Sequence, residues 1–254
     1  MTSWPALGLA HADPADAFAH GGAASLGRVL DDAQLAIVRG AIEEIRAQGV
    51  QGPYATIIHD GWRLSPALAA LVPVVGAAAC RALGIDELVL FHEHILIKPP
   101  GGDDMSWHQD FSYLPLDRAD GMTLWIALDD VTEANGCLYY VLGTHALGER
   151  RAAWGLMGDD DPRAGLPPIE VAPDEGGTPA PTGAGCAIAH HVYLWHRSPA
   201  NASDKTRRAW ALSFVSPEAR WSPKHSPHPR SAVSPREEGQ ALEADLLRVA
   251  IARR

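Results

Sequence analysis

Apolar positions in the first third of the chain recur at the spacing of α-helices. Between residues 31 and 48 they repeat every three or four residues, at Leu35, Val38, Ile42 and Ile45, which predicts an amphipathic helix. Ser65 is a good N-cap residue and Pro66 suits the first helical turn, so a second helix is predicted to run to about Leu83. We expect both helices to pack on the outside of a β core.

From residue 88 onward the pattern changes to that of β-strands. Five apolar runs are separated by segments rich in Gly, Pro, Asn and Asp, and they occupy residues 88–98, 122–128, 137–142, 185–194 and 209–215. Short strands with long insertions and flanking helices are typical of an all-β core folded as a double-stranded β-helix, or jelly roll. We therefore predict a single domain over residues 1–254 with its jelly-roll core at about 88–215.

The remaining segments carry weaker patterns. Residues 1–28 are rich in Gly, Ala and Pro and are expected to form an irregular lead-in. Residues 146–185 show little periodicity, and because a loop of this length inside a compact domain is usually functional, we predict an active-site lid. The sequence Ser-Pro-Arg-Glu at residues 234–237 is a capping-box pattern with Pro at the first helical position, which predicts a last helix over 235–253.

Composition narrows the range of partners. Against 31 acidic residues there are 21 Lys and Arg, a formal net charge of −10, which argues against a nucleic-acid partner. Residues 1–20 contain no Lys or Arg, unlike a secretory signal, and Pro and Arg interrupt the most apolar stretch, residues 64–85, unlike a membrane span. Three widely spaced cysteines favour free thiols in a reducing compartment. We expect a cytoplasmic protein that acts on a small molecule, and the sequence leaves its oligomeric state open.

A close His-x-Asp pair and a distant histidine form a candidate metal site, His108, Asp110 and His196. Residues two apart in an extended segment point to the same side, so His108 and Asp110 could bind one ion. Two imidazoles and one carboxylate are the ligand set of mononuclear non-haem iron(II), and they leave three positions open for substrates. Three protein ligands and a water also form a catalytic zinc site, so a zinc-dependent hydrolase is an alternative.

Two longer stretches resemble a known family. Residues 105–145 read MSWHQDFSYLPLDRADGMTLWIALDDVTEANGCLYYVLGTH, and residues 196–214 read HRSPANASDKTRRAWALSF. Together they resemble the phytanoyl-CoA dioxygenase family, whose members are oxygenases that use iron(II) and 2-oxoglutarate. The resemblance covers roughly residues 88–215, and it implies that His108, Asp110 and His196 bind Fe(II), with 2-oxoglutarate as co-substrate and O2 as oxidant. A non-catalytic metabolite-binding jelly roll is the other alternative.

The resemblance also implies where the far carboxylate of 2-oxoglutarate binds. Arg207 lies eleven residues after His196, at the offset where the family places its 2-oxoglutarate arginine. A bidentate guanidinium suits a carboxylate, and strand alternation would turn the neighbouring Arg208 to the opposite side. Ser198 would share the face of His196 and could donate its hydroxyl to the same carboxylate. The alternative for either arginine is a solvated surface charge.

Two more residues are expected in the co-substrate pocket. Trp125 matches the family's pocket tryptophan, although a purely structural place in the core is the alternative, because large aromatic residues are usually buried. His94 lies four residues before Lys98 of the KPP segment, where family members place a pocket residue. His92 and His94 would also lie on one strand face, so a second metal site is a further alternative.

The primary substrate is the least constrained expectation. Arg197 follows the distal histidine where many family members have glycine, and no long basic surface for coenzyme A is evident, so an acyl-CoA substrate is not expected. The variable segments instead offer aromatic rings and hydrogen-bond donors at Trp154, Arg197, Trp221, Lys224, His225 and His228. Such a mixture favours a polar, ring-containing molecule, plausible in natural-product biosynthesis. Since Asp110 is present, hydroxylation or oxidative cyclisation is expected and chlorination is not.

Overall fold

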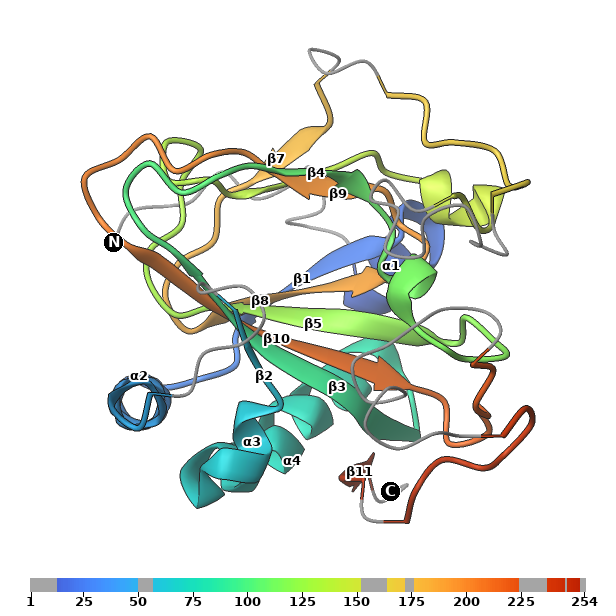
Figure 1. Ribbon diagram of the computed structural model, residues 1–254, viewed down its shortest axis with the longest axis horizontal. Helices are drawn as coiled ribbons and strands as arrows, with labels where there is room; N and C mark the ends of the chain where they lie inside the picture. Colours follow the sequence, from blue (N-terminus) through green and yellow to red (C-terminus); the bar gives the residue numbers. More distant parts are fainter. Residues whose placement is uncertain are drawn as a thin grey trace.

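The computed structural model describes residues 13–49, 57–151, 164–171, 176–223, 237–244 and 246–251. Two antiparallel sheets face each other (Figure 1). The large sheet contains, in spatial order, β1 (Ala23–Arg28), β8 (Cys186–His191), β5 (Gly121–Ala127), β10 (Arg207–Val215), β3 (Glu87–Lys98) and β11 (Arg248–Ala250), with β2 (Ile57–His59) also paired to β3. The small sheet contains β4 (Met105–His108), β9 (His196–Ser198), β6 (Leu138–Tyr140) and β7 (Thr178–Ala180).

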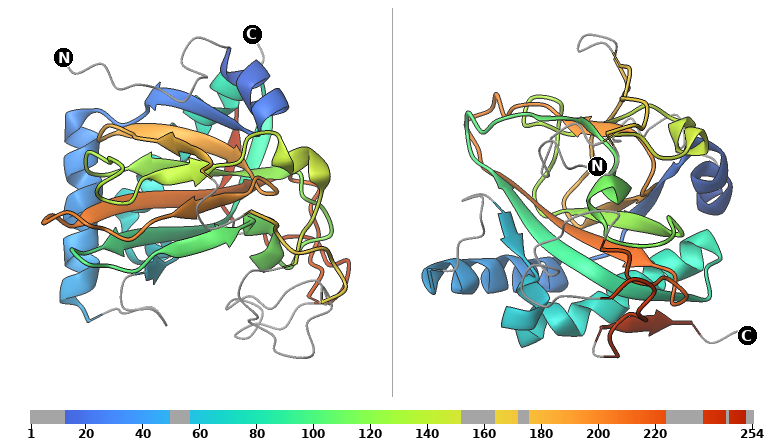
Figure 2. Two further views of the ribbon diagram at one scale, coloured as in Figure 1. Left: turned by 90° about the horizontal axis from the view of Figure 1, so that it is seen from above. Right: turned by 45° about the vertical axis from the view of Figure 1, so that its right-hand side comes forward.

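Helices cover the face of the large sheet that points away from the small sheet (Figures 1 and 2). They are α1 (Pro14–Gly21), α2 (Asp32–Ala47), α3 (Gly61–Leu64) and α4 (Pro66–Leu83), and two 3-10 turns, η1 (Asp110–Tyr113) and η2 (Thr144–Leu147), flank the small sheet. Apolar residues of α2 and α4 form one core with outward-facing residues of the sheet, among them Ile42, Leu68, Trp210, Leu212 and Phe214. The predicted packing of both helices on the outside of a β core is confirmed.

Local signals place the ends of these helices. The Asp31 side chain accepts a hydrogen bond from the Gln34 N–H, the Gln34 side chain accepts one from Asp31, and this capping box opens α2. Ser65 caps α4, which ends at Gly84 in the left-handed conformation. By length and composition α4 could cross a membrane, but Leu68 and Val72 are buried against the sheet, as in the core helix of a soluble protein.

Strand alternation decides which side chains reach the space between the two sheets. On β10 the outer positions, such as Trp210 and Leu212, belong to the helix-packed core, whereas Ala209 and Ala211 belong to a second core shared with the small sheet. The inner face therefore also includes Arg207 and, through the antiparallel register, the even-numbered residues of β3 from 92 to 98. A one-residue shift of either strand would exchange these two sets.

The N-terminal prediction is wrong in the described part of residues 1–28. Residues 13–28 form α1 and β1 instead of an irregular lead-in. Asp13 caps α1 by accepting a hydrogen bond of 2.9 Å from the Ala15 N–H, and Pro14 occupies the first turn. The strand β1 pairs along β8, so its conformation depends on a partner more than 150 residues away, which the small local residues do not reveal.

The predicted C-terminal helix over 235–253 is also wrong. Within the described residues 237–244 and 246–251 the chain forms turns and then β11, which pairs with β3. Leu242, Leu246 and Val249 have helical spacing, but the first two are buried in a core beside Trp221 and the third in the helix-packed core. Tertiary packing has therefore overridden the local pattern. Ser234, the start of the capping box, lies outside the described residues.

The segment 146–185 is not a loop throughout. Its residues 178–180 form β7, which pairs with β6 in the small sheet, and residues 146–147 complete η2. Residues 152–163 and 172–175 lie outside the described part of the chain. The lid therefore remains a proposal for the rest of this segment.

Candidate functional site

The structure brings His108, Asp110 and His196 together between the two sheets. His108 ends β4, Asp110 opens η1 after the single residue Gln109, and His196 opens β9, where it is the antiparallel partner of His108. One ligand atom from each residue can be chosen so that all lie within 4.8 Å of one another. Sequence spacing predicted this cluster, and the pairing of β4 with β9 closes the gap of 86 residues between Asp110 and His196.

Backbone carbonyls orient both imidazoles toward the centre of this cluster. Nδ1 of His108 is 2.8 Å from the Ser106 carbonyl oxygen, and Nδ1 of His196 is 2.8 Å from the Leu194 carbonyl oxygen. Since a carbonyl only accepts, each Nδ1 carries the proton and each Nε2 presents a lone pair. These Nε2 atoms lie 3.8 and 3.4 Å from Oδ1 of Asp110. The donor set fits one metal ion, because both rings are fixed in the tautomer that binds through Nε2.

The second carboxylate oxygen of Asp110 is held by the large sheet. Oδ2 accepts a hydrogen bond of 2.5 Å from the Thr123 hydroxyl and lies 3.0 Å from Nε2 of His190. The hydroxyl of Tyr140 lies 2.9 Å from Nδ1 of His190, so it can donate there while Nε2–H donates to Asp110. These hydrogen bonds engage Oδ2 of Asp110 and leave Oδ1 facing the two ligand histidines. Sequence reasoning missed Thr123 and Tyr140, which reach the site through strand pairing.

Burial and charge set the protonation of the cluster. Burial and the neighbouring His196 lower the pKa of His108 to about 3, which keeps this imidazole neutral near pH 7. Burial alone would raise the pKa of Asp110, but His196 and the hydrogen bond from His190 hold it well below its usual range. Burial alone would lower the pKa of His196, but Asp110 raises it. A firmly ionised carboxylate beside imidazoles is the arrangement that a divalent cation requires.

Arg207 and Ser198 lie together at the opposite end of the inner face. The Arg207 side chain is 2% exposed, and its Nη2 donates to the Ser198 hydroxyl and to the Gly136 carbonyl, both at 2.9 Å. Its guanidinium lies 5.5 Å from the centroid of the Trp125 ring. Burial lowers the pKa of Arg207 to about 10. Among the described residues no carboxylate forms an ion pair with this buried cation, which fits a site for an anionic ligand.

Lys98 adds a second cation that sequence reasoning used only as a reference point. Its Nζ donates to the Ser198 hydroxyl at 2.8 Å and to the carbonyls of Ser198 and Pro199 at 3.0 and 2.6 Å. Burial, and then the charge of Arg207, lower the pKa of Lys98 to about 8. The register that pairs Lys98 with Arg207 could not be read from sequence. Two cations that share one serine further favour an anion at this place.

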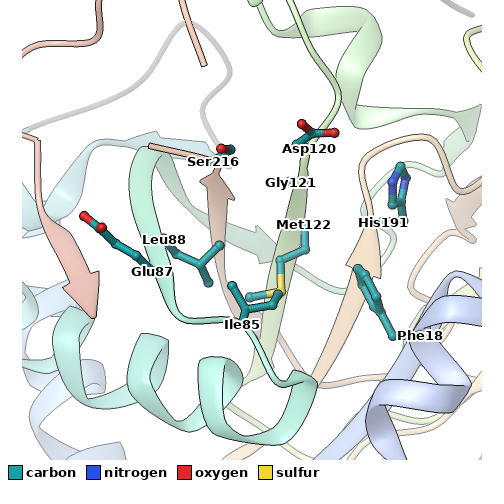
Figure 3. A pocket seen from close by; sticks show the side chains of 9 residues that line it. All are labelled: Phe18, Ile85, Glu87, Leu88, Asp120, Gly121, Met122, His191 and Ser216. Carbon is teal, nitrogen blue, oxygen red and sulfur yellow. The ribbon is translucent and has the colours of Figure 1, made fainter. Parts of the chain in front are cut away.

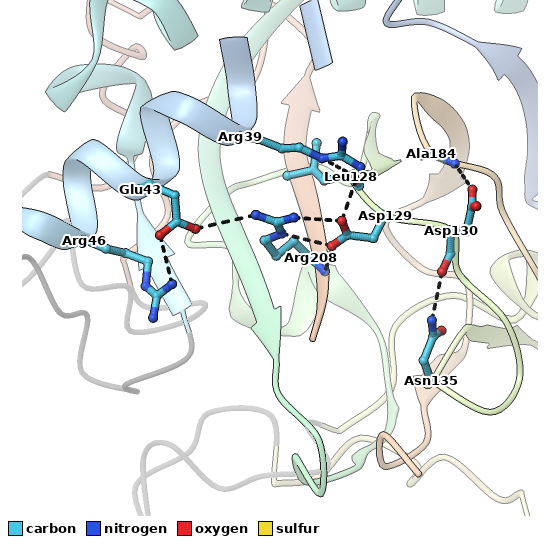
Figure 4. A network of polar contacts seen from close by, with 9 residues as sticks. All are labelled: Arg39, Glu43, Arg46, Leu128, Asp129, Asp130, Asn135, Ala184 and Arg208. Atoms are coloured by element: carbon cyan, nitrogen blue, oxygen red, sulfur yellow. Dashed lines mark hydrogen bonds and ion pairs between the residues drawn. The ribbon is translucent and has the colours of Figure 1, made fainter. Parts of the chain in front are cut away.

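Arg208 faces the other side of the sheet, as strand alternation predicted. It forms a two-pronged ion pair with Asp129, at 3.0 and 2.9 Å, and Asp129 is also within 3.3 Å of Arg39 on α2 (Figure 4). Oε1 of Glu43, also on α2, lies 3.5 Å from Nη1 of Arg208. The side chain of Arg208 therefore fastens α2 to the ends of β5 and β10, and it is not free to bind a ligand on the inner face.

His94 lies on the inner face but away from Arg207 and Lys98. It is the antiparallel partner of His59 on β2 and of Ala211 on β10, two inner-face positions from Lys98. The alternative of a second metal site at His92 and His94 gains no support, since in the described part of the chain His108, Asp110 and His196 form the one cluster that meets metal-ligand spacing. Glu93 lies on the outer face, where it accepts a hydrogen bond from the Trp210 indole.

The predicted walls of the substrate pocket are only partly described. Arg197 stacks over the rings of Trp107 and Tyr139, at 5.2 and 5.1 Å from their centroids. Trp221 is 0% exposed in a core beside Phe91, so the expectation that it lines the pocket is wrong. The other four predicted positions, Trp154, Lys224, His225 and His228, lie outside the described residues.

A separate pocket of about 310 Å³ opens where β3 and β5 begin and β8 ends (Figure 3). Its apolar floor includes Phe18 of α1, Leu88 and Met122, and Asp120 and His191 lie at its edge. Met122 is the neighbour of Thr123 on β5, so it points to the face opposite the metal cluster. None of the predicted site residues lines this pocket.

Comparison with known proteins identifies the family. The family model described as phytanoyl-CoA dioxygenase matches residues 55–209, more than half of the chain. The chain belongs to the phytanoyl-CoA dioxygenase family. The expectation drawn from residues 105–145 and 196–214 is therefore confirmed.

Curated relatives of this phytanoyl-CoA dioxygenase family member align with only part of its sequence. A protein of Danio rerio named phytanoyl-CoA dioxygenase domain-containing protein 1 is 32% identical over 152 residues, which are 58% of this chain and 52% of that protein. The chain thus spans about half the length of the curated relatives it matches.

Two solved structures confirm the jelly-roll fold class over nearly the whole chain. One is a non-haem α-ketoglutarate-dependent carbocyclase, SnoK, from nogalamycin biosynthesis, with a TM-score of 0.76 and 25% identity over 94% of this chain and 96% of that one. The other is the epimerase SnoN in complex with Fe3+, α-ketoglutarate and nogalamycin RO, with a TM-score of 0.75 and 22% identity over 91% and 95%. The predicted cofactor set of Fe(II), 2-oxoglutarate and O2 agrees with these names and with the His-Asp-His cluster.

Proposed function

We propose that the protein is an Fe(II)- and 2-oxoglutarate-dependent oxygenase. One observation carries the proposal: the metal cluster and the buried, anion-seeking Arg207 are joined by a single short strand. His196 and Ser198 share one face of β9, and Ser198 accepts a hydrogen bond from Arg207. Two residues of a strand span about 6.6 Å, which matches the length of a five-carbon dicarboxylate.

The residues divide between the metal and the co-substrate. His108, Asp110 and His196 would hold iron, and bound iron supplies the activation of oxygen. Arg207 and Ser198 would bind the far carboxylate of 2-oxoglutarate by charge-assisted hydrogen bonds.

Two further side chains, Lys98 and Trp125, support this assignment of the co-substrate. Lys98 adds positive charge to the carboxylate end, beside Arg207. The Trp125 ring packs against the Arg207 guanidinium and keeps water from it. His94 lies two inner-face positions from Lys98, outside the carboxylate end of the co-substrate site.

The two alternatives explain less of this arrangement. A zinc-dependent hydrolase would use the three ligands but has no need of a buried arginine and lysine at one carboxylate length from them. A non-catalytic metabolite-binding protein has no need of the hydrogen bonds from Thr123 and His190 that hold the Asp110 carboxylate in place.

Anaerobic titration tests the proposal. Protein loaded with Fe(II) should develop a visible charge-transfer band when 2-oxoglutarate is added, and the band should be absent from Arg207→Ala at the same co-substrate concentration. A protein that takes up zinc in preference to iron, or gives no band at saturating 2-oxoglutarate, would support one of the alternatives.

We further propose a polar, ring-containing small-molecule substrate that is hydroxylated or oxidatively cyclised, as in natural-product biosynthesis. The support is the likeness to the carbocyclase from nogalamycin biosynthesis at 25% identity over nearly the whole chain. Arg197, stacked on two aromatic rings, supplies the aromatic and donor character that favours such a molecule. Turnover of a fatty acyl-CoA and none of polar cyclic compounds would contradict this substrate class.

We propose that the part of the segment 146–185 outside η2 and β7 closes over the bound substrate. Its start is tied to the metal site by Gln109, which lies between two ligands and donates to the Gly148 carbonyl at 2.9 Å, while the Arg150 N–H donates to the Gln109 side chain at 2.7 Å. Faster uncoupled oxidation without substrate after shortening this segment would support the lid.

We also propose a cytoplasmic location, consistent with three cysteines that are all free.

A further inference from the structure

Three imidazoles gather at the edge of the inner face, apart from the metal ligands. The histidine cluster consists of His59 on β2 and of His92 and His94 on β3. Nδ1 of His59 lies 3.2 Å from Nε2 of His92, and the ring of His94 lies 5.1 and 6.2 Å from those of His92 and His59. Three histidines this close, in a chain of 254 residues with 12, need an explanation beyond packing.

The cluster and the metal site share the inner face of one sheet. His92 is the partner of Ser213 on β10, which in turn is the partner of Thr123 on β5, the residue that donates to Asp110. The cluster is therefore two strands, roughly 9–10 Å, from Thr123. A small molecule bound at the cluster would lie beside the metal.

Two ring nitrogens of the cluster have no hydrogen-bond partner in the part of the chain that the structure describes. Nδ1 of His94 and Nε2 of His59 are enclosed and have no hydrogen-bond partner among the described residues. An enclosed polar atom without a partner destabilises the folded state. Buried polar groups are nearly always satisfied, so a ligand is the natural source of the missing partners.

Charge decides which kind of ligand fits. Burial, and then His92, lower the pKa of His59 to about 4, and burial lowers that of His94 to about 3, so both rings are neutral near pH 7. The charged group beside the cluster is Asp60, whose Oδ1 is 3.5 Å from Nδ1 of His92. A phosphate or carboxylate bound there would meet the Asp60 carboxylate. Neutral imidazoles, each with one donor and one acceptor, match hydroxyl and carbonyl groups.

We propose that His59, His92 and His94 form the subsite that binds neutral hydroxyl or carbonyl groups of the primary substrate, next to the metal centre. This inference rests on the proposed oxygenase function and specifies its substrate class. The subsite holds an oxygenated part of the molecule at the edge of the sheet, which directs a neighbouring carbon toward the cluster of His108, Asp110 and His196.

The test uses the anaerobic complex of the full chain with Fe(II) and 2-oxoglutarate, titrated calorimetrically with two matched probe pairs. The pairs are resorcinol with 1,3-dimethoxybenzene, and methyl α-D-glucopyranoside with its permethylated form. At least one hydroxylated probe should bind about tenfold more tightly than its methyl ether. His94→Leu and His59→Leu should each reduce that preference to within about twofold, whereas His94→Gln, which keeps a donor and an acceptor, should retain part of it.

His20→Leu is the matched control, because it removes an imidazole exposed on α1 and should leave the preference unchanged. Equal binding of the free and methylated probes by the native protein, or an undiminished preference in both leucine variants, would overturn the subsite. The charge-transfer band with 2-oxoglutarate, measured on every variant, separates the two proposals. Its absence from the native protein rejects the oxygenase function, and its presence without a probe preference rejects the subsite alone.

Discussion

Two adjacent arginines illustrate how much one residue of strand alternation decides. Arg207 is enclosed on the inner face with Ser198, whereas Arg208 forms an ion pair with Asp129 on the outer face. Arg207→Ala should weaken 2-oxoglutarate binding by about 2–5 kcal/mol, because it removes a charge-assisted pair, and it should leave Fe(II) binding nearly unchanged.

Arg208→Ala is the paired control for this prediction. It should lower the thermal midpoint, since Asp129 loses its partner and α2 loses a tie to the sheet, but it should barely change 2-oxoglutarate affinity. Affinities from anaerobic titration of the two variants decide the matter. Equal losses in both variants, or none in Arg207→Ala, would show that the anchor is assigned to the wrong arginine.

The contact of His190 with Asp110 predicts an effect on metal binding. His190→Leu should lower Fe(II) affinity by about 10–100-fold, because Oδ2 of Asp110 loses a donor and the carboxylate is no longer held in place. His190→Gln, which can still donate, should recover part of the affinity. Competition with a chelator of known affinity measures both. Native metal affinity in His190→Leu would show that Thr123 alone is sufficient to position the carboxylate.

Sequence reasoning reached the site residues whose relation is local. His196 and Ser198 lie two apart on β9, and Gln109 between His108 and Asp110 has extended backbone, so alternation places each pair on one side. Lys98, Thr123 and Tyr140 could not be reached in this way. Each meets the site through the register between strands distant in sequence, and a shift of one residue would turn them to the opposite face.

At the scale of elements, helices with their own end signals were predictable. The ends of α2 and α4 follow from a capping box, a proline in the first turn and a terminal glycine. The short strands β1, β7 and β11 were not, because three to six residues carry too little pattern and their conformation depends on pairing with β8, β6 and β3. The prediction of a C-terminal helix is wrong for the same reason, because β11 depends on its pairing with β3.

Glu93 links β3 to the start of α3 and predicts how stability changes with pH. Its carboxyl accepts hydrogen bonds from the Trp210 indole and the Trp62 N–H, and burial raises its pKa from 4.5 to about 8. The folded state therefore keeps a proton that the unfolded state releases above about pH 4.5. This contribution to the free energy of unfolding is complete below pH 4.5 and is lost as the pH rises to 8, by at most about 1.4 kcal/mol per pH unit.

Glu93→Gln removes this ionisation while keeping a similar shape. Urea unfolding between pH 5 and 8 should therefore show a smaller decline in stability for Glu93→Gln than for the native protein. An unchanged slope between the two proteins would mean that Glu93 is ionised in the folded state as well.

At the scale of the whole molecule, the intact ligand set predicts the type of reaction. Asp110 occupies a position that would have to be empty for chloride to bind the metal, and it is held there by Thr123 and His190. Oxidation of an accepted substrate in chloride buffer should therefore give a product with oxygen added or hydrogen removed. Mass spectrometry of the products tests this, and a chlorinated product from the native protein would contradict it.

The most direct test of the central claim is the balance of 2-oxoglutarate consumption. Native protein supplied with Fe(II) and 2-oxoglutarate should consume oxygen and form succinate in a one-to-one ratio, slowly alone and faster with an accepted polar cyclic substrate. Asp110→Ala and Arg207→Ala should each reduce succinate formation to the level of a protein-free control, the first by loss of metal and the second by loss of co-substrate. Zinc should not replace iron. Succinate formation that persists in Asp110→Ala, or none from the iron-loaded native protein with any substrate, would contradict the account.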